Sequence, residues 1–514
     1  MSNIVFSESD LQQIQSLGLT ANDVEKQIDN FRKGFPKIHL SDAATISNGG
    51  IRVLDDQSIS YYLDMYHALS TGKRILKFVP ASGAASRMFK DLYTFASTYF
   101  GVAGNFSKEF PEVKTFLEHL RTFAFYGDLC KEMEKASLDI HDYLQRGDYS
   151  TIINFLLKEQ YLGYGSKPKA LLKFHRYGAL QRTPLEEHIV EGAEYALSSD
   201  GKLRLHFTVS PEHRAMFRKK IAEVRRYYED ALAIRIDISL SEQKHYTDTI
   251  AVDEYNNPIR DDEGRLVFRP GGHGALIENL GDCNADLIFI KNIDNVVPDW
   301  DKHTTIVYKK ALAGMLLQLQ DRTFQYVKEL KDGKTSKAKI KEIEQFATDR
   351  LGLTLPQPDK KTSRASQLFE LLNRPMRICG MVRNQGEPGG GPFFVEDADG
   401  NRSLQIVESA QINRKDPQQE SIFQQSTHFN PVDLVCGTKD YRGRRFNLRQ
   451  FRDPATGFIA KKSKGSTIVK SQELPGLWNG AMAHWITIFV EVPLATFNPV
   501  KTVNDLLRKE HLDH

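Results

Sequence analysis

A chain of 514 residues is too long for one simple hydrophobic core, so its length predicts two or three domains or one large α/β domain with insertions. With 40% hydrophobic and 26% charged residues, the composition is that of a globular protein and excludes wholesale disorder. Lys and Arg exceed Asp and Glu only by 69 to 66, which gives no reason to expect nucleic acid or an anionic membrane as a partner.

The cysteines and the N-terminus indicate the compartment. The four cysteines form no C-x-x-C pair, which disfavours a zinc site or disulfide framework and favours reduced cytosolic thiols. The opening MSNIVFSESDLQQ is polar and acidic, unlike a signal peptide. Apolar runs such as WITIFVEV at 485–492 have strand length and are too short to span a bilayer. We therefore expect a soluble, cytoplasmic protein with no membrane partner.

Residues 1–70 predict a helical N-terminal extension. Ser7 with Asp10 and Thr20 with Asp23 have the spacing of capping boxes ahead of helical segments. From residue 71 onward the pattern changes to that of one α/β domain, which we expect to extend to residue 514.

This α/β domain begins with an apolar strand that ends at Pro80, a turn of small residues, and an amphipathic helix. Two helical insertions are expected, at about 92–160 and 304–370. Strand-like runs alternate with helical runs after Lys167, and this alternation predicts a Rossmann-like, mainly parallel mixed sheet flanked by helices. The predicted strands lie at 203–210, 234–240, 286–293 and 376–382, and the predicted helices at 184–197, 211–230 and 304–331. Residues 436–470 appear irregular and basic in the sequence.

The turn ASGAASRM at 81–88 is a candidate phosphate-binding loop. Ala81, Ser82, Gly83 and Ala84 are small, so their backbone N–H groups can approach an anion closely at the start of a helix. Arg87 adds a mobile positive charge. The alternative is that small residues merely permit tight packing of strand on helix, and on this segment alone that alternative is the stronger.

The order of several motifs adds a resemblance. The turn resembles the A-G-G-x-G-T-R-M/L signature of sugar-phosphate nucleotidyltransferases, with Ser, Ala and Ser in place of Gly, Gly and Thr. KPKALL (167–172) and TPLEEHIVEG (183–192) resemble the P-K-A-L-L and P-L-x-E-H segments that follow it. Five further segments are similar to the UDP-glucose pyrophosphorylase branch: RPGGHGAL (269–276), IFIKNIDNVV (288–297), GGGPFFVEDADGNRSLQIVE (389–408), THFNPVDL (427–434) and TFNPVKTVNDLL (496–507).

The resemblance covers residues 79–508 and implies a GT-A-type fold within the UDP-sugar pyrophosphorylase superfamily. The altered glycines indicate a bacterial branch with a substrate of its own. The resemblance also implies transfer of a nucleoside monophosphate, expected to be UMP, from a nucleoside triphosphate to a sugar-1-phosphate. Pyrophosphate would leave, and Mg²⁺ would be the cofactor. The sugar, the base and the oligomeric state stay open.

Roles for single residues follow from the same resemblance. Asp294, after an apolar strand, would hold Mg²⁺. Arg87, Lys169 and Lys501 would be the catalytic cations that stabilise phosphate charge. The remaining candidates would bind the nucleotide (Ala81, Ser82, Gly83, Ala84, Gln243, Gly272, His273) or the sugar (Asn295, Glu408, Asn430).

Structural explanations compete with each role. Asp294 could cap a helix, Lys169 could be a surface lysine, and Lys501 could pair with Asp505 one turn later. A lone histidine such as His273 is more often a structural residue than a ligand. Glu408 and Asn430 could be ordinary polar residues at strand ends.

Two other classes of protein compete with the enzyme. A non-catalytic nucleotide-sugar binding protein would keep the fold without needing Asp294, Lys169 and Lys501 in one cleft. A nucleic-acid-binding protein would use the basic segments 442–446 and 461–465, but these lack the interleaved aromatic residues that stack on bases. We therefore expect no nucleic acid among the partners.

Overall fold

A computed structural model describes residues 5–99, 106–333, 335–358, 361–387, 389–397, 400–464 and 467–512. Parts of the two predicted insertions, and Gly465 of the basic segment 461–465, lie outside these residues. The chain forms two compact units, each assembled from three stretches. Unit 1 comprises Met1–Leu76, Ser241–Ile290 and Tyr308–Leu494, and unit 2 comprises Lys77–Leu240, Lys291–Val307 and Ala495–His514.

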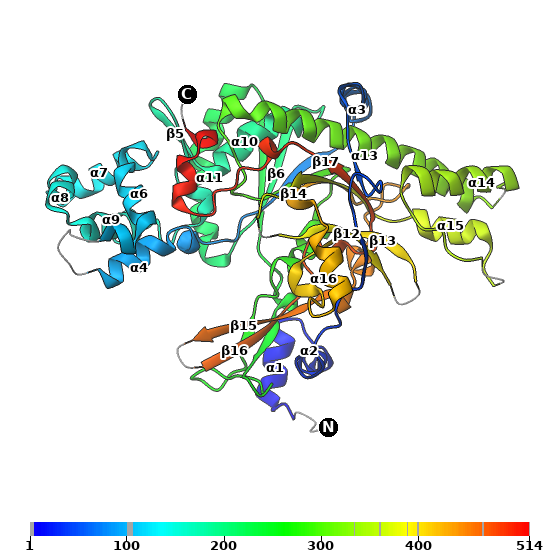
Figure 1. Cartoon of the computed structure of the whole chain (residues 1–514), viewed down its shortest axis with the longest axis horizontal. Helices are drawn as coiled ribbons and strands as arrows, with labels where there is room; N and C mark the ends of the chain where they lie inside the picture. Colours follow the sequence, from blue (N-terminus) through cyan, green and yellow to red (C-terminus); the bar gives the residue numbers. More distant parts are fainter. Residues whose placement is uncertain are drawn as a thin grey trace. The chain divides into compact units, whose positions relative to one another are not determined.

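The strands of unit 2 lie in the order β3 (Ile75–Pro80), β6 (Lys202–Thr208) and β7 (Arg235–Ser241). From Lys77 onward β3 pairs with β6 in parallel, as in an α/β fold. Helix α10 (Pro184–Tyr195) packs against β6 and against α11 (Arg214–Leu232). Helix α10 begins with Pro184 and a capping box between Thr183 and Glu186, and both devices favour helix initiation. Figure 1 shows α10 and α11 beside β6.

A group of short helices follows β3 in unit 2 and surrounds an aromatic-rich core (Figure 1). Val500, Val503 and Leu506 of the C-terminal segment are buried in the same core. Burial of these three side chains holds the segment that carries Lys501 against the helices. The helices are α4 (Lys90–Thr98), α5 (Phe106–Glu109), α6 (Pro111–Glu118), α7 (Tyr126–Lys135), α8 (Ile140–Arg146) and α9 (Tyr149–Leu157). The small hairpin of β4 (His175–Tyr177) and β5 (Leu180–Arg182) precedes α10.

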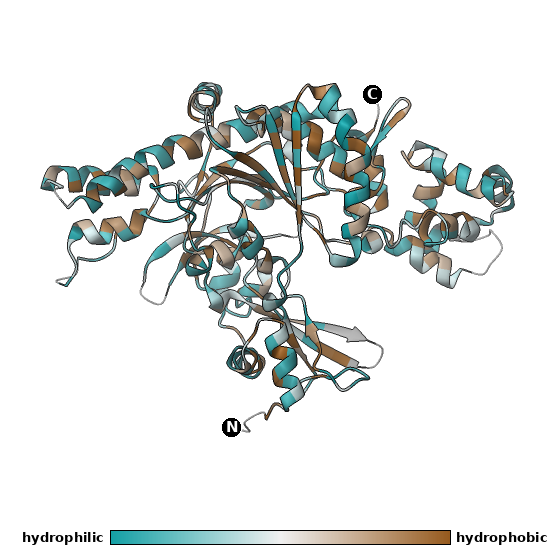
Figure 2. Ribbon diagram, turned by 180° about the vertical axis from the view of Figure 1, so that it is seen from behind, coloured by the Kyte–Doolittle hydropathy of each residue, from teal (hydrophilic) through white to brown (hydrophobic). Residues whose placement is uncertain are grey.

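The largest sheet portion of unit 1 has the order β2 (Ile51–Arg52), β17 (Ile486–Glu491), β11 (Met376–Arg383), β14 (His428–Gly437) and β10 (Leu287–Lys291). All ten residues of β14 are buried, so this strand is covered on both faces. Figure 2 shows these strands mostly in the colour of apolar residues. The long helix α13 (Lys302–Lys331) passes close to α3 (Asp56–Leu69) at Gly314, where a Cβ would lie 1.8 Å from the Tyr62 carbonyl oxygen.

Two smaller sheets complete unit 1. The first contains β1 (Leu40–Ala43), β12 (Gly391–Glu396) and β13 (Arg402–Val407). The second contains β15 (Phe458–Lys464), β16 (Thr467–Glu473), β8 (Thr249–Val252) and β9 (Phe268–Arg269). Helices α1 (Glu8–Ser16) and α2 (Ala21–Lys33) pack on the second sheet. Further helices are α12 (Ile277–Asp282), α14 (Lys337–Gln345), α15 (Arg364–Leu372) and α16 (Pro417–Gln424).

The prediction of irregular structure for 436–470 is wrong for its last part, because β15 forms an antiparallel hairpin with β16. Its sequence FIAKKSK lacks a clean apolar–polar alternation, and the pairing with β16 forms it.

The predicted fold class is confirmed. The pairs β2/β17, β17/β11 and β3/β6 are parallel, β11/β14 is antiparallel, and helices flank the strands. Among the described residues, no helix combines the length and the apolar character that a membrane crossing requires.

Candidate functional site

The small-residue loop of unit 2 is held by backbone pairing on both sides. Ala81 N–H donates to the Thr208 carbonyl at 2.9 Å, which ties the end of β3 to the end of β6. Ala84 forms an antiparallel bridge with Pro168, in which Lys169 N–H donates to the Gly83 carbonyl at 3.3 Å. Between these anchors, residues 82–84 are exposed, and none of their N–H groups has a partner in the described part of the chain. The loop therefore presents free donors.

Lys169 lies at the centre of the candidate site. Its Nζ donates to Asp294 Oδ2 at 2.9 Å and to the Val500 carbonyl at 2.8 Å. The side chains of Lys169 and Asp294 are 15% and 20% exposed, so the pair can be reached by a ligand. Val500 N–H donates back to the Asp294 carbonyl at 3.1 Å. Three distant stretches of sequence thus meet at one ammonium group.

Asn295 connects the Asp294 turn to the C-terminal segment. It is 2% exposed, its Nδ2 donates to the Thr496 carbonyl at 3.1 Å, and its Oδ1 accepts from Asn498 N–H at 2.9 Å. Because both polar groups bond this segment, Asn295 is a positioning residue for it, and the predicted sugar contact has no support in this geometry.

The other two predicted cations are exposed. Lys501 Nζ lies 5.8 Å from the centre of the Phe497 ring, and its backbone N–H donates to Asp505 Oδ2 at 2.8 Å. Asp505 pairs with Arg508 through its other oxygen at 2.6 Å, so the competing Lys501–Asp505 ion pair does not form. Arg87 ends the short helical turn Ala85–Arg87 and makes no hydrogen bond or ion pair with described residues. Both cations are free to contact a ligand.

Sequence reasoning missed a buried ionic group in unit 2. Glu191 of α10 accepts from Lys77 Nζ at 3.0 Å and from Lys291 Nζ at 2.8 Å, and all three side chains are at most 2% exposed. Tyr195 hydroxyl also donates to Glu191 at 2.6 Å. Burial alone would raise the pKa of Glu191, but Lys291 and Lys77 hold it well below its ordinary value. The cluster places two lysine side chains and one carboxylate in the interior of unit 2.

A second buried carboxylate, Glu187, lies one turn earlier on α10. It accepts from Lys302 Nζ at 2.6 Å and from His175 Nδ1 at 3.0 Å. His175 Nε2 bonds His511 Nδ1 at 2.9 Å, which attaches the C-terminal segment to the β4/β5 hairpin. Burial opposes ionisation of Glu187, but Lys302 and His175 lower its pKa to about 2. The sequence signal for these buried carboxylates is the three glutamates in the otherwise mostly apolar segment TPLEEHIVEG.

Some predicted residues gather separately within unit 1. His273 accepts from Leu477 N–H at 3.1 Å and stacks on the Trp478 ring at 4.5 Å, and burial lowers its pKa. Asn479, two residues after Leu477, donates to Glu408 at 2.7 Å. This arrangement favours a neutral His273.

Asn430 belongs to the same group of unit 1. Its N–H donates to the Gly390 carbonyl at 2.8 Å, and a Cβ on Gly390 would lie 3.6 Å from the side chains of both Glu408 and Asn479. The buried atoms Asn430 Nδ2 and Asn479 Oδ1 have no partner in the described structure. Unused buried donors and acceptors of this kind point to a polar, uncharged ligand group such as a hydroxyl.

Gly272 and Gln243 have different surroundings. Gly272 has φ of +76° and precedes His273, and a Cβ there would lie 2.8 Å from a Glu473 carboxylate oxygen. This left-handed backbone conformation explains why a glycine occupies the position. Gln243 donates to Asp248 at 3.1 Å, and in the described residues no contact joins it to the His273–Glu408 group. The structure therefore brings Gly272 to this group but not Gln243.

A metal would have to be held jointly with a ligand. Within the described residues, no three His, Cys, Asp or Glu side chains are grouped as metal ligands. Asp294 Oδ1 nevertheless has no partner there, and the side chain is partly exposed. One carboxylate oxygen fits Mg²⁺, which is often bound by one or two carboxylates together with substrate phosphates and water.

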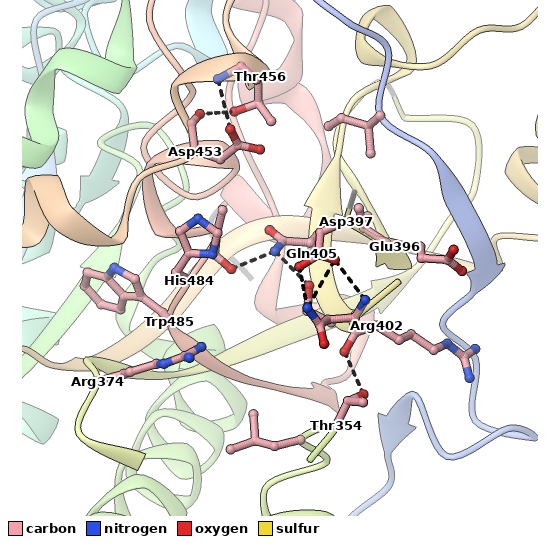
Figure 3. A pocket seen from close by; sticks show the side chains of 18 of the residues that line it. Thr354, Arg374, Glu396, Asp397, Arg402, Gln405, Asp453, Thr456, His484 and Trp485 are labelled. Carbon is pink, nitrogen blue, oxygen red and sulfur yellow. Dashed lines mark hydrogen bonds between the residues drawn. The ribbon is translucent and has the colours of Figure 1, made fainter. Parts of the chain in front are cut away.

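A cavity of about 1080 Å³ lies elsewhere in unit 1, and none of the predicted site residues lines it (Figure 3). Its walls come from α15, the β12/β13 hairpin and the segment 480–485. The cavity is therefore lined by residues other than those of the two groups described above, although Val407 and Gly480 are chain neighbours of Glu408 and Asn479.

The fold and the unit 2 geometry define an α/β protein in which a lysine–aspartate pair lies beside a loop with free backbone donors. The chain belongs to the family of DUF4301 proteins, described as a domain of unknown function, whose model matches residues 7–512.

Solved structures similar to this chain include UDP-glucose pyrophosphorylase from Leishmania major, with 13% identity, a TM-score of 0.45, and coverage of 98% of this chain and 79% of that chain. UDP-N-acetylglucosamine pyrophosphorylase from Trypanosoma brucei has 13% identity, a TM-score of 0.47 and the same coverage. UDP-glucose phosphorylase from Trypanosoma brucei has 15% identity, a TM-score of 0.44, and coverage of 97% and 77%. A search among curated proteins gives no match.

Proposed function

We propose that the protein is a nucleotidyltransferase that transfers a nucleoside monophosphate, UMP in the first instance, from a nucleoside triphosphate to a sugar-1-phosphate. One observation carries the proposal: Lys169 Nζ bonds Asp294 and Val500 together, at 2.9 and 2.8 Å, while Lys169 N–H bonds Gly83 of the loop. The motifs that resemble the sugar-phosphate nucleotidyltransferases contribute each of these residues. The resemblance and the geometry support the same site.

The phosphates of the nucleotide are proposed to lie on the loop of unit 2. The free N–H groups of Ser82, Gly83 and Ala84 donate to phosphate oxygens, and the exposed Arg87 and Lys501 reach the same anion. Lys169, whose position is set by Asp294 and Val500, neutralises charge at the α-phosphate. Unit 2 thereby supplies the cations that an encounter of two anions requires.

In the proposed reaction, a phosphate oxygen of the sugar-1-phosphate attacks the α-phosphorus. A new P–O bond forms, the bond between the α-phosphorus and the bridging oxygen breaks, and pyrophosphate leaves with that oxygen. The protein makes no covalent bond to either substrate, so positioning and charge stabilisation supply the rate. Lys169, Arg87 and Lys501 stabilise the added negative charge.

The free Oδ1 of Asp294 is the proposed ligand for Mg²⁺, together with phosphate oxygens of the nucleotide. When bound, the ion neutralises phosphate charge and makes the α-phosphorus more electrophilic. In unit 1, Glu408, Asn430 and Asn479 are proposed to bind sugar hydroxyls, with Gly272 and His273 beside the nucleoside.

A non-catalytic nucleotide-sugar binding protein is the second candidate function, and the altered loop favours it, because two glycines of the related signature are Ser82 and Ala85 here. The two candidates differ in pyrophosphate release, which only the enzyme supports.

The test is a screen of pyrophosphate release with four nucleoside triphosphates against a panel of sugar-1-phosphates, in Mg²⁺ and in EDTA. We expect turnover with at least one pair, its loss in EDTA, and its loss in Asp294→Ala. Asp230→Ala is the matched control, because the Asp230 side chain is 76% exposed on α11 of the same unit. Full turnover in Asp294→Ala, or none with any pair in the wild type, would reject the proposal.

A further inference from the structure

The cavity in Figure 3 contains an arginine without an ionic partner. Arg374 follows α15 and is half-buried in the cavity wall, where its Nε donates to the Glu370 carbonyl at 3.1 Å. Neither terminal NH₂ group of this guanidinium has a hydrogen-bond or ion-pair partner among the described residues. Burial lowers the pKa of Arg374, and Glu370 opposes that change only in part. Glu370, which also lines the cavity, offsets part of this desolvation through space, but among the described residues no carboxylate bonds the guanidinium directly.

Trp485 and His484 line the same cavity as Arg374. Trp485, 4% exposed, also lines the cavity, and its indole N–H is buried without an acceptor. His484 lies next to it in the chain and is exposed in the same wall (Figure 3). The Trp485 indole N–H is closed off from solvent, so Trp485 contributes to the wall of the cavity and not to the donors that a ligand can reach.

The rest of the lining is mixed, because the carboxylates of Glu370, Glu396, Asp397 and Asp453 line the cavity together with apolar side chains. Leu371, Ile406 and Val407 contribute apolar surface beside Trp485. At about 1080 Å³ the cavity has the size of small-molecule sites, which are mostly apolar with a few placed polar groups.

A second arginine in the same cavity provides a comparison. Arg402 lies over the Phe394 ring at 3.7 Å and pairs with Asp42 at 3.4 Å. Its charge is already compensated within the protein, unlike that of Arg374. The two arginines of this cavity therefore differ in whether an acidic side chain is paired with the guanidinium.

We propose that this cavity binds a small organic anion, with an apolar body on the aliphatic lining and a phosphate or carboxylate group held by Arg374. This site is additional to the residues proposed for the reaction, none of which lines the cavity.

The test uses phenyl phosphate as the probe and phenol as its uncharged comparator, titrated calorimetrically into the full chain. We expect phenyl phosphate to bind the wild type and phenol to bind far more weakly. Arg374→Gln should reduce the affinity for phenyl phosphate at least about tenfold, which is the loss expected when hydrogen bonds to a charged group are removed. Arg402→Gln should change the affinity less than about twofold. If Arg374→Gln fails to fold, Arg374→Lys replaces it, with an intermediate loss expected because a lysine cannot form the bidentate contact.

Hydrogen exchange locates the bound probe. We expect slower exchange at 364–374 and 480–487 in the wild type, and no slowing there in Arg374→Gln. An unchanged affinity in Arg374→Gln, an equal loss in Arg402→Gln, or protection confined to the loop at 82–87 would each overturn the proposal.

Discussion

The two units hold their candidate residues in opposite electrostatic states. In unit 2, the buried and partly buried charges are paired, Lys169 with Asp294 and Glu191 with both Lys77 and Lys291, while the exposed Arg87 and Lys501 have no ion pair among the described residues. In unit 1, uncharged amides dominate, and the buried atoms Asn430 Nδ2 and Asn479 Oδ1 are left without partners. Paired charges form a preorganised field for an anion, while unpaired amide groups match hydroxyls. This difference is the basis of the proposal that unit 2 binds phosphate and that unit 1 binds a sugar or nucleoside.

The largest expected effect concerns the buried charges of unit 2. Glu191→Gln leaves two buried lysines without a carboxylate, so the free energy of unfolding should fall by about 4 kcal/mol. Glu194→Gln is the control, because Glu194 is exposed on the same helix, and it should change stability by less than about 0.5 kcal/mol. Urea denaturation measures both variants. Equal stability of the two would show that the lysines do not depend on Glu191.

Lowering the pH should reduce the stability of unit 2, because the unfolded chain binds a proton at His511 that the folded protein excludes. Burial, together with His175 and Arg508, lowers the pKa of His511 to about 3 from an ordinary 6.5. The unfolded chain therefore binds a proton that the folded protein excludes, and stability is full above pH 6.5 and falls as the pH decreases toward 3. Between pH 6.5 and pH 4.5 the loss from this group is about 2 kcal/mol.

His511→Gln should reduce the loss of stability between pH 6.5 and pH 4.5, measured by urea denaturation at each pH. His245→Gln, at an exposed histidine of unit 1, should leave the pH dependence unchanged. A wild-type slope retained in His511→Gln would remove His511 from the acid response between pH 6.5 and pH 4.5 and leave the buried His188, whose pKa is also lowered.

The smallest expected effect tests unit 1. Glu408→Gln keeps the shape of the side chain but removes its charge, so KM for the sugar-1-phosphate should rise about tenfold with little change in kcat. Glu254→Gln, at an exposed residue of the same unit, is the control. An effect on KM for the nucleoside triphosphate alone would contradict a sugar contact and assign Glu408 to the nucleotide.

The sequence was most informative where a residue's position along a strand decided its neighbours. Asp294 follows β10 and the small-residue loop follows β3, and strand ends in α/β sheets are where ligands bind. The motif order added Lys169, which the structure places 2.9 Å from Asp294. These contacts required no knowledge of side-chain packing.

Contacts that depend on three-dimensional packing escaped prediction. The partners of Glu191 come from two strands more than 200 residues apart, and no local pattern indicates that both lysines face α10. Asn295 was predicted beside a sugar, but the fold of the C-terminal segment occupies both its polar groups. No sequence motif marks Arg374, because the absence of an ionic partner can be recognised only in the folded chain.

The most direct test of the central claim is pyrophosphate release by Lys169→Met, compared with Lys219→Met at an exposed lysine of the same unit. Because Lys169 joins Asp294 to the C-terminal segment and faces the proposed phosphates, kcat/KM should fall by about 10²- to 10³-fold, while Lys219→Met stays at the wild-type level. A Lys169→Met protein that is folded and releases pyrophosphate at the wild-type rate would contradict the account.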